Sequence, residues 1–533
     1  METLSRSPTG ERFTGEMAKG AHSVAEHMAG ETVGPLIRRA RNTEAYTQRG
    51  LAEALNTAAG SDTLTWNDVA RWERGKRIPG HYWRHWLSTV LQIPQREMDK
   101  AAALAKQQRQ QVSTQPEPHA SESLESANTG GLTLGFSELL AGDPADTLES
   151  LSTGRHLVLP GGRSFTGSTA AVQVHPATRC DDAHVAIEVE NERLLTNFLR
   201  RPQRGMIIGA ITDPRGQVRH IGLEAHAARR QLARHQSRSA TLSAPFCYEL
   251  DSFTRAVLWA VANLDDALLT DDAELTQSCH ELSTYEQMPG SAVSREAAPE
   301  LTTISRMWLG SYFCARHILR NTGEFPDIPV FWTREQRGEE ACTWLLFQHK
   351  YDYLRHTTER FAGSDTPLVR AFCIPEDAVH TSPPAERILL FLAAALMESF
   401  GIQTQACIEP EYSDVEGFVL APQGHAIIAN WIRSEGIWHV DTTARRSRLH
   451  DFTEAAGHAR THSIIDAPAP KARLTALASY LDLDWPWLSQ RCAGFARYGW
   501  DGFLRPRNRL LSLAGLDQAC RYVSTLRDPV GRQ

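Results

Sequence analysis

The stretch TQRGLAEALNTAAGSDTLTWNDVARWERGKRIPG, residues Thr47–Gly80, decides the fold of the first part of this chain. Leu51, Ala52 and Leu55 have the spacing of one buried helical face, so we expect a helix over Gln48–Leu55. Such a helix presents its apolar face to a core and its polar face to solvent.

A second short helix is expected over Trp66–Arg74, where Val69 and Trp72 are three residues apart on the inner face. Thr47 is suited to the N-cap of the first helix, and Gly75 to the left-handed position after the second. Two helices joined in this way form a helix-turn-helix, an arrangement that can place the second helix in a DNA groove.

Three runs carry a resemblance to a known family: LIRRARN at Leu36–Asn42, TQRGLAEAL at Thr47–Leu55 and VARWERGKRIP at Val69–Pro79. The segment that contains them, Pro35–Ala105, resembles the lambda-repressor-like (XRE-family) DNA-binding domains of transcriptional regulators. The sequence departs from that pattern in one place, because the turn Asn56–Leu64 is several residues longer than usual. The relative tilt of the two helices is therefore left open.

The resemblance implies that DNA is contacted by the start of the second helix, the start of the first helix and the basic residues around them. In that arrangement Asn67 can pair with adenine and Arg71 with guanine, while Gln48 holds a phosphate. The residues expected to contact DNA are Gln48, Arg49, Trp66, Asn67, Asp68, Arg71, Arg74, Lys76, Arg77, Arg38 and Arg39. In the alternative interpretation, the arginines are a solvated face of an ordinary helical bundle.

Charge is distributed unevenly along the chain. The whole chain has a formal net charge of −7, which argues against general affinity for nucleic acid. Between Leu36 and Arg109 there are 13 Lys and Arg against 7 Asp and Glu, a net charge of +6 that leaves −13 for the rest. This asymmetry is typical of a DNA-binding head on an acidic body.

Length and composition predict a soluble multidomain protein. The 533 residues suffice for about three domains, and no apolar run approaches the ~20 residues of a membrane span. The first residues, METLSRSPTGERF, have no apolar signal core, so we expect a cytoplasmic, nucleoid-associated protein. The nine cysteines form no CxxC pair, and the adjacent Cys279 and His280 are weak evidence for a metal. We expect neither a metal nor a cofactor.

The predicted fold is multidomain, with an all-α helix-turn-helix head and an α+β body. We expect a flexible N-terminal arm, the head, a disordered linker rich in Gln, Ser, Glu and Pro, an α/β domain of unknown role and an α+β domain with a helical C-terminal part. These parts are expected at residues 1–33, 34–106, 107–131, 132–282 and 300–533.

The first body segment contains three strand-like runs, at His156–Leu159, Met206–Thr212 and His220–Leu223. The last two are expected to form a hairpin with Asp213–Gly216 as its turn. A long amphipathic helix is expected over Leu250–Leu269.

The glycine-rich run GGRSFTGST, Gly161–Thr169, lacks the Gly-Lys-Ser/Thr ending of a phosphate loop, so we expect an ordinary loop. Ser283–Pro299 is expected to be a polar connector. In the second body segment, Ile304–Leu319 and Glu339–Tyr353 are expected to be helices, with His317 a packed or surface residue rather than a catalyst.

Two features of the second body segment carry a further resemblance. ERILLFLAAALMESFGIQTQAC, Glu386–Cys407, is an apolar helix that leads into a strand, and GHAIIANWIRSEGIWHVDTT, Gly424–Thr443, is a pair of strands. They resemble the transglutaminase-like core, and the resemblance assigns His425 and Asp441 to that family's histidine and aspartate. The cysteine position is occupied by Glu386, which cannot form an acyl-enzyme as a thiolate does. We therefore expect a degenerate triad without catalysis, although a chance pattern is an alternative.

Together these features favour a DNA-binding transcriptional regulator of actinobacterial type, a homodimer on double-stranded DNA with an inverted-repeat operator. Its body would set the oligomeric state and respond to a small-molecule or peptide effector. Two alternatives differ in class: a DNA-tethered amidase, protease or transglutaminase with a reactive thiol near His425, and a scaffold or defence component that the head locates on DNA.

Overall fold

The computed structural model describes residues 32–44, 46–59, 64, 66–75, 78–112, 133–134, 155–189, 195, 198–200, 204–213, 216–234, 240–323, 325–363 and 366–527. These residues belong to two compact units, Met1–Ser126 and Ala127–Gln533, which are called the head and the body below. Apart from residues 32 and 33, the arm expected at 1–33 lies outside the described residues, as does the expected linker after residue 112.

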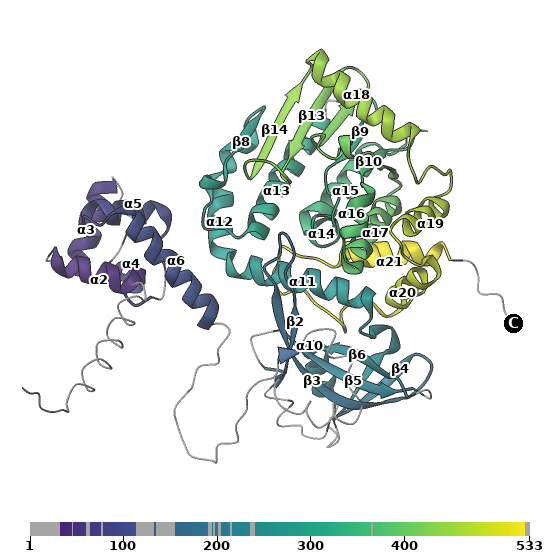
Figure 1. Ribbon diagram of the computed structural model, residues 1–533, viewed down its shortest axis with the longest axis horizontal. Helices are drawn as coiled ribbons and strands as arrows, with labels where there is room; N and C mark the ends of the chain where they lie inside the picture. The colour runs from purple at the N-terminus through teal and green to yellow at the C-terminus, as the bar shows by residue number, and fades with distance from the viewer. Residues whose placement is uncertain are drawn as a thin grey trace, which may run out of the picture. The chain divides into compact units, whose positions relative to one another are not determined.

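The described part of the head is a bundle of helices with one shared core (Figure 1). Its helices are α2 (Val33–Thr43), α3 (Gln48–Ala59), α4 (Trp66–Glu73), α5 (His81–Val90) and α6 (Gln95–Val112). Leu51, Leu55 and Val69, which the periodicity predicted as apolar faces, are each 0% exposed. The expected helices at 48–55 and 66–74 are thus present, and α6 continues through 107–112, the first residues of the predicted linker.

Local side chains fix where the helices of the head begin and end. The Thr47 hydroxyl accepts a hydrogen bond from the Gly50 amide at 2.9 Å, as expected of an N-cap. Gly75 follows α4 with a φ of +66°, the left-handed conformation predicted for it. The Asn56 side chain binds both main-chain groups of Leu64, at 2.8 and 3.1 Å, and so holds the long turn against α3.

The first sheet of the body is mixed. Its strand order is β1-β2-β3-β4-β7, and β5 pairs with both β3 and β6. The strands are β1 (Thr133–Leu134), β2 (Arg155–Leu159), β3 (Ser168–Arg179), β4 (His184–Val189), β5 (Gly205–Thr212), β6 (Val218–Glu224) and β7 (Ala240–Pro245), with helix α10 (Ala225–Arg234) after β6. The predicted β5–β6 hairpin is confirmed, and Gly216 in its turn has a φ of +80°.

The second sheet contains the strands of the predicted transglutaminase-like region. Its order is β11-β10-β9-β12-β13-β14-β8, with parallel pairing among the first three strands and antiparallel pairing among the others. The strands are β8 (Ser291–Val293), β9 (Val330–Thr333), β10 (Val369–Cys373), β11 (Gln403–Cys407), β12 (Phe418–Ala421), β13 (His425–Asn430) and β14 (Trp438–Thr443). The connector expected at 283–299 therefore contributes an edge strand, β8.

Helices pack on both sheets and join them into one body. Helix α11 (Ser252–Thr270) lies between the first sheet and the helices near the second (Figure 1), and the Asp251 side chain caps its first turn. The other helices are α12 (Asp272–Glu281), α13 (Thr303–Thr322), α14 (Gly338–Leu346), α15 (Gln348–Arg360), α16 (Glu376–Thr381), α17 (Pro384–Ser399), α18 (Arg446–Thr461), α19 (Pro470–Tyr480), α20 (Trp485–Tyr498) and α21 (Ala514–Thr525). Short 3-10 turns cover Phe246–Tyr248, Ser283–Gln287, Arg295–Ala297 and Pro410–Tyr412.

The single helix expected over Glu339–Tyr353 is wrong, because the chain breaks at Phe347 into α14 and α15. Phe347 is extended and forms an antiparallel bridge with Leu511. Leu346 accepts from the Ser512 amide at 2.8 Å, and Gln348 donates to the Leu510 carbonyl at 3.1 Å. Main-chain bonds to a distant segment thus replace the helical bonds at this point.

The segments expected as separate domains, 132–282 and 300–533, share one hydrophobic core within the body. A buried ion network also joins them: Arg204 pairs with Glu224 at 3.0 Å and with Asp265, which accepts the main-chain amides of Arg507 and Asn508. Among the described residues, no helix has the length and apolar character needed to cross a membrane.

Candidate nucleic-acid interface

Helix α4, the expected recognition helix, is held against α2 and α3. Val69 and Trp72 are 0% and 2% exposed, and a Cβ on Gly34 of α2 would lie only 2.8 Å from the Trp72 carbonyl oxygen. Only glycine lets α2 approach the end of α4 so closely. Asp68 is half-buried. The side chains of Trp66, Asn67 and Arg71, and the residues Lys76 and Arg77, lie outside the described part of the chain.

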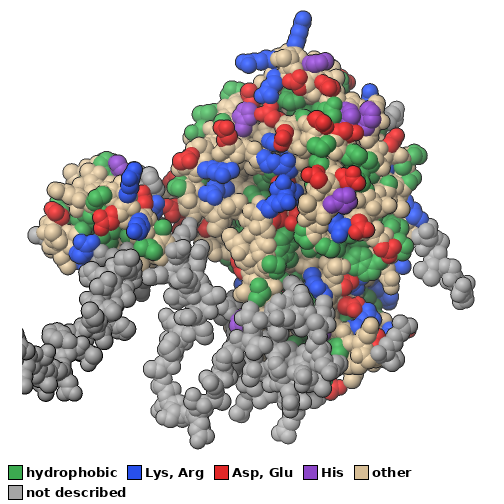
Figure 2. All heavy atoms as spheres, viewed as in Figure 1, with side chains coloured by type: hydrophobic (Ala, Val, Ile, Leu, Met, Phe, Trp, Pro, Cys, Tyr) green, Lys and Arg blue, Asp and Glu red, His purple; other side chains and the backbone are tan. Residues whose placement is uncertain are grey.

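The predicted basic residues that the structure describes are at the surface. The side chains of Arg38, Arg39 and Arg49 are 53%, 59% and 81% exposed. Arg39 lies 3.9 Å from Glu97, and Arg49 lies 3.1 Å from Glu53. Figure 2 shows acidic and basic side chains interspersed on the visible face of the head. Exposed ion pairs of this kind are weak, so a phosphate can replace the carboxylate.

Arg38 and Arg39 also line an open hollow on the outer side of α2, together with Pro35, Asn42 and Thr43. Arg74, at the end of α4, is exposed and uses its Nε to bind the Ala70 carbonyl at 2.9 Å. These arginines therefore offer guanidinium groups to the outside of the head while the apolar faces of the same helices form its core.

Glu73 is a buried residue at the centre of a hydrogen-bond and ion-pair network in the head, which the sequence did not reveal. Its side chain is 1% exposed and is paired with Arg41. The Gln48 amide donates to Glu73 Oε2 at 2.7 Å, and Arg38 donates to the Glu73 carbonyl at 3.2 Å. The Gln48 side-chain amide, which is expected to hold a phosphate, donates in this structure to the buried Glu73 carboxylate. Glu73 instead ties α2 and α3 to α4.

The strand register separates two members of the candidate triad. Ile428 is opposite Asp441, and Ala426 is opposite Thr443, so Asp441 shares a sheet face with Ala426 and Ile428. His425 precedes Ala426 in the same strand and therefore points to the other face. The histidine and aspartate that the resemblance aligns are not brought together.

The third member, Glu386, is packed into a helix–helix contact. It lies in the first turn of α17, and a Cβ on Gly338 of α14 would come within 2.3 Å of the Glu386 Cα. Burial raises the pKa of the Glu386 carboxyl, and the neighbouring Glu339 raises it further. The position expected for a nucleophile is thus part of the contact between α14 and α17.

The thiols nearest in sequence to that region are remote from His425. Cys373 on β10 is in register with Cys407 on β11, and both are buried. β10, β9 and β12 separate β11 from β13, a distance of about 19 Å at about 4.8 Å per strand. Their thiols donate to main-chain carbonyls, Cys373 to that of Glu409 at 3.2 Å and Cys407 to that of Phe372 at 3.6 Å. Neither thiol is placed to act with His425.

Other predicted features have structural roles. The glycine-rich run is a loop up to Gly167, after which β3 begins. Its Ser164 and Phe165 amides bind the Glu339 carboxylate at 2.9 and 3.3 Å, so a side chain of the body occupies the place a phosphate would take. His317 is 5% exposed, and burial lowers its pKa to about 4, as fits a packed, neutral histidine. Within the described residues, no three His, Cys, Asp or Glu side chains are grouped as metal ligands.

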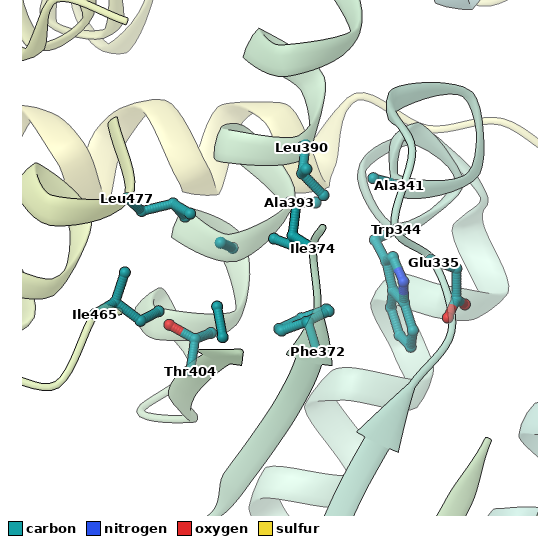
Figure 3. Close-up of a pocket in the computed structure, with 12 residues that line it drawn as sticks. Glu335, Ala341, Trp344, Phe372, Ile374, Leu390, Ala393, Thr404, Ile465 and Leu477 are labelled. Atoms are coloured by element: carbon teal, nitrogen blue, oxygen red, sulfur yellow. The ribbon is translucent and has the colours of Figure 1, made fainter. Parts of the chain in front are cut away.

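The body also contains buried charges that the sequence did not reveal. A small apolar cavity of about 10 Å³ lies among α14, α17, β10 and β11, and Figure 3 shows Trp344 and Glu335 at one of its ends. On the other side of these two residues lies a larger cavity of about 50 Å³, lined also by Lys350 and Arg370. The only signal in the sequence was a charged residue inside an apolar run, as at Lys350 in WLLFQHKYDY.

Comparison of the chain with protein-family models, with curated proteins and with solved structures found no match.

Proposed function

We propose that this protein is a sequence-specific DNA-binding transcriptional regulator that acts as a homodimer. The head would bind one half of an inverted repeat in double-stranded DNA, and the body would set the dimer and respond to an effector. One head of this size reads only a half-site, so pairing two heads increases both affinity and specificity.

The observation that carries the proposal is that the helices of the head bury their apolar side chains and expose basic ones. The apolar residues of the XRE-like pattern form its core, and the basic residues Arg38, Arg39 and Arg49 of the same helices are exposed. The net charge of +6 between Leu36 and Arg109, against −13 for the rest, favours a polyanionic partner for this part of the chain.

The recognition helix in this proposal is α4. Helical periodicity puts positions 67 and 71 of α4 on the side of the helix opposite Val69, which is buried in the core. Asn67 and Arg71 are the residue types that read adenine and guanine by paired hydrogen bonds. Arg38, Arg39, Arg49 and Arg74 would then contact phosphates on either side of the groove, with Lys76 and Arg77 beside them.

The test compares base-reading and phosphate-contacting variants on a selected DNA site. Arg71→Ala is expected to reduce discrimination at one base position by about 1–3 kcal/mol. Lys76→Ala is expected to weaken binding to all sequences alike and to lower the slope of log K against log salt by about 1. Lys100→Ala, an exposed charge on α6, is the matched control and should change neither quantity.

Both quantities come from fluorescence anisotropy titrations of matched and mismatched duplexes at several salt concentrations. If Arg71→Ala keeps full discrimination, α4 is not the recognition helix. If the wild type shows no preference between duplexes, the head is not a sequence-specific reader.

A further inference from the structure

The cavity lined by Lys350 and Arg370 lies where several elements of the second half of the chain meet. Helices α13, α14 and α15, strands β9, β10 and β13, and the segment before β14 all contribute to its wall. The cavity has a volume of about 50 Å³. One water needs about 10–15 Å³ on this measure, so the space holds about three to five waters or one small molecule.

Two buried cations and one carboxylate line this cavity. Lys350 is 2% exposed, and its Nζ lies 2.7 Å from Oε1 of Glu335, which is 5% exposed. Arg370 is 4% exposed. Its two terminal nitrogens donate hydrogen bonds to neutral groups, the Thr333 hydroxyl at 2.8 Å and the Tyr353 hydroxyl at 3.1 Å. Among the described residues, no carboxylate is paired with Arg370.

Among the buried charges of the wall that the structure describes, that of Arg370 is therefore left without a counter-charge, and half-exposed Arg334 adds a second guanidinium at the edge of the cavity. Whichever of Lys350 and Glu335 holds the proton, that pair contributes no net charge, and a guanidinium remains protonated in proteins. Aromatic rings offset part of the cost of burial: Lys350 lies 3.9 Å from the Trp344 ring centre and 4.2 Å from that of Trp431. Rings cannot replace an anion, because burying an unpaired charge is costly.

The polar groups left without partners in this wall are donors. Within the part of the chain that the structure describes, no acceptor is bound to the buried donors Trp332 Nε1, Arg334 Nε, Trp344 Nε1, Arg370 Nε and Asn430 Nδ2. The acceptors of the same wall have donors: Glu335 binds Lys350, Thr333 and Tyr353 bind Arg370, and Asn430 Oδ1 accepts from the Gly417 amide at 2.6 Å. A molecule that fills the cavity must accept hydrogen bonds and has little to donate them to.

We infer that this cavity is a binding site for a small organic monoanion of the carboxylate class, of the size of formate or acetate. Its carboxylate accepts from the Arg370 and Trp344 donors, and its carbon lies against the aromatic rings. The small volume and the aromatic rings of the wall favour a carboxylate over phosphate, which is larger and has no carbon to place against the rings. Half-exposed Arg334, Ile318 and Trp431 mark the side from which the anion enters. The inference concerns the body alone and does not depend on DNA binding by the head.

The test measures anion binding by the full-length protein without DNA. Sodium chloride is replaced stepwise by sodium acetate or sodium formate at constant ionic strength and pH 7, and the Tm is recorded with the heat of binding. A ligand that binds only the folded state raises the Tm with its concentration. Acetate and formate are expected to give a saturable heat of binding and a Tm increase that follows the same saturation, whereas phosphate and the larger benzoate should shift the Tm only through their general salt effect.

Two tryptophan variants decide whether binding occurs at this site. Trp344→Phe removes one indole donor and keeps a ring beside Lys350, and it should weaken acetate binding about tenfold, as for the loss of one hydrogen bond to a charged group. Trp308→Phe is the control, because its buried indole nitrogen also has no partner among the described residues but lies outside this cavity. It should bind acetate like the wild type.

Several results would overturn the inference. They are the absence of a saturable Tm increase in acetate, equal acetate affinity for Trp344→Phe and the wild type, and tighter binding of phosphate or benzoate than of acetate. The first means that the cavity holds only water, the second that acetate binds elsewhere, and the third that the ligand class or size is wrong. Loss of DNA binding by the head would leave all of these measurements unchanged.

Discussion

The head and the body bury charge over very different distances along the chain. In the head, the buried Glu73 is bound by Arg41 and Gln48, which precede it by 32 and 25 positions. In the body, Asp265 joins Arg204 to the amide of Arg507, across 61 and 242 positions. The buried pairs of the head thus lie within one short segment, whereas those of the body join segments that are far apart in the sequence.

This difference separates the parts of the molecule that a sequence motif can describe from those that it cannot. The helices of such a bundle are described by periodicity and caps, which are properties of neighbouring residues. A body held by pairs between remote segments depends on topology and register, and a motif of a few residues contains neither. Variants that break local and remote pairs separately test this comparison.

The largest loss of unfolding free energy is expected on replacing Asp265, which is 0% exposed and pairs with Arg204. Asp265→Ala leaves a buried arginine short of a partner, so the body should lose about 3–5 kcal/mol of its unfolding free energy. Denaturant unfolding measures the loss. Asp272→Asn, which removes an exposed pair with Arg509, is the control and should cost less than about 1 kcal/mol. Equal losses in the two variants would contradict the role of the network.

The second prediction concerns the pH dependence of the body's unfolding free energy, which we expect to depend on Glu224 of the same network. Burial raises the pKa of Glu224 to about 7, although Arg204 opposes the shift. The folded pKa lies above the unfolded one, so this contribution is fully present below about pH 4.5 and is lost as the pH rises through 7. Relative to Glu224→Gln, which cannot ionise, the wild type should lose about 3 kcal/mol between pH 4.5 and 8.

Unfolding free energies of the wild type and Glu224→Gln across this pH range give the difference directly. Glu281→Gln, at an exposed position on α12, is the control and should follow the wild type at every pH. A difference between the wild type and Glu224→Gln that stays constant from pH 4.5 to 8 would show that Glu224 titrates normally.

In the head, Glu73→Gln keeps the size of the side chain but removes the charge that Arg41 needs. We expect the head to lose about 2–3 kcal/mol, the penalty of a charged hydrogen bond left unmade in a buried place. Amide hydrogen exchange of α2 to α6 measures this loss while leaving the body as an internal reference. Glu53→Gln, an exposed partner of Arg49, should change exchange little. Faster exchange in the body as well would show that the effect of Glu73→Gln is not confined to the head.

The smallest effect is expected at the long turn of the head. Asn56→Ala removes the two hydrogen bonds to Leu64 and should cost about 1–2 kcal/mol. Because these bonds hold the approach to α4, affinity for DNA should fall with stability. Thr57→Ala, one residue further along the exposed side of α3, is the control. If Asn56→Ala weakens neither exchange protection nor DNA binding, the turn does not position α4.

The comparison also explains how far the sequence could predict the structure. The helices around Leu51 and Val69 and the hairpin turned at Gly216 follow from local spacing and turn chemistry, and all are present. The break at Phe347 was not predictable in the same way, because its cause is a main-chain bridge to Leu511.

The candidate triad was likewise predictable only in part from the sequence. The resemblance aligned His425 and Asp441 correctly with strands, but their separation depends on the register of β13 and β14. A shift of one residue would have placed both on one face. Buried Glu73 and Arg370 were missed because nothing in their neighbouring residues distinguishes them from charges at the surface.

The central claim, that the head reads a DNA sequence, is tested most directly by recovering genomic fragments bound to the intact protein at about 0.15 M salt, where non-specific phosphate binding is weakened. The account predicts a few sharp sites that share an inverted repeat, and it predicts that Arg71→Ala alters the sequence recovered. A flat profile across the fragments, the same for the wild type and Arg71→Ala, would contradict it.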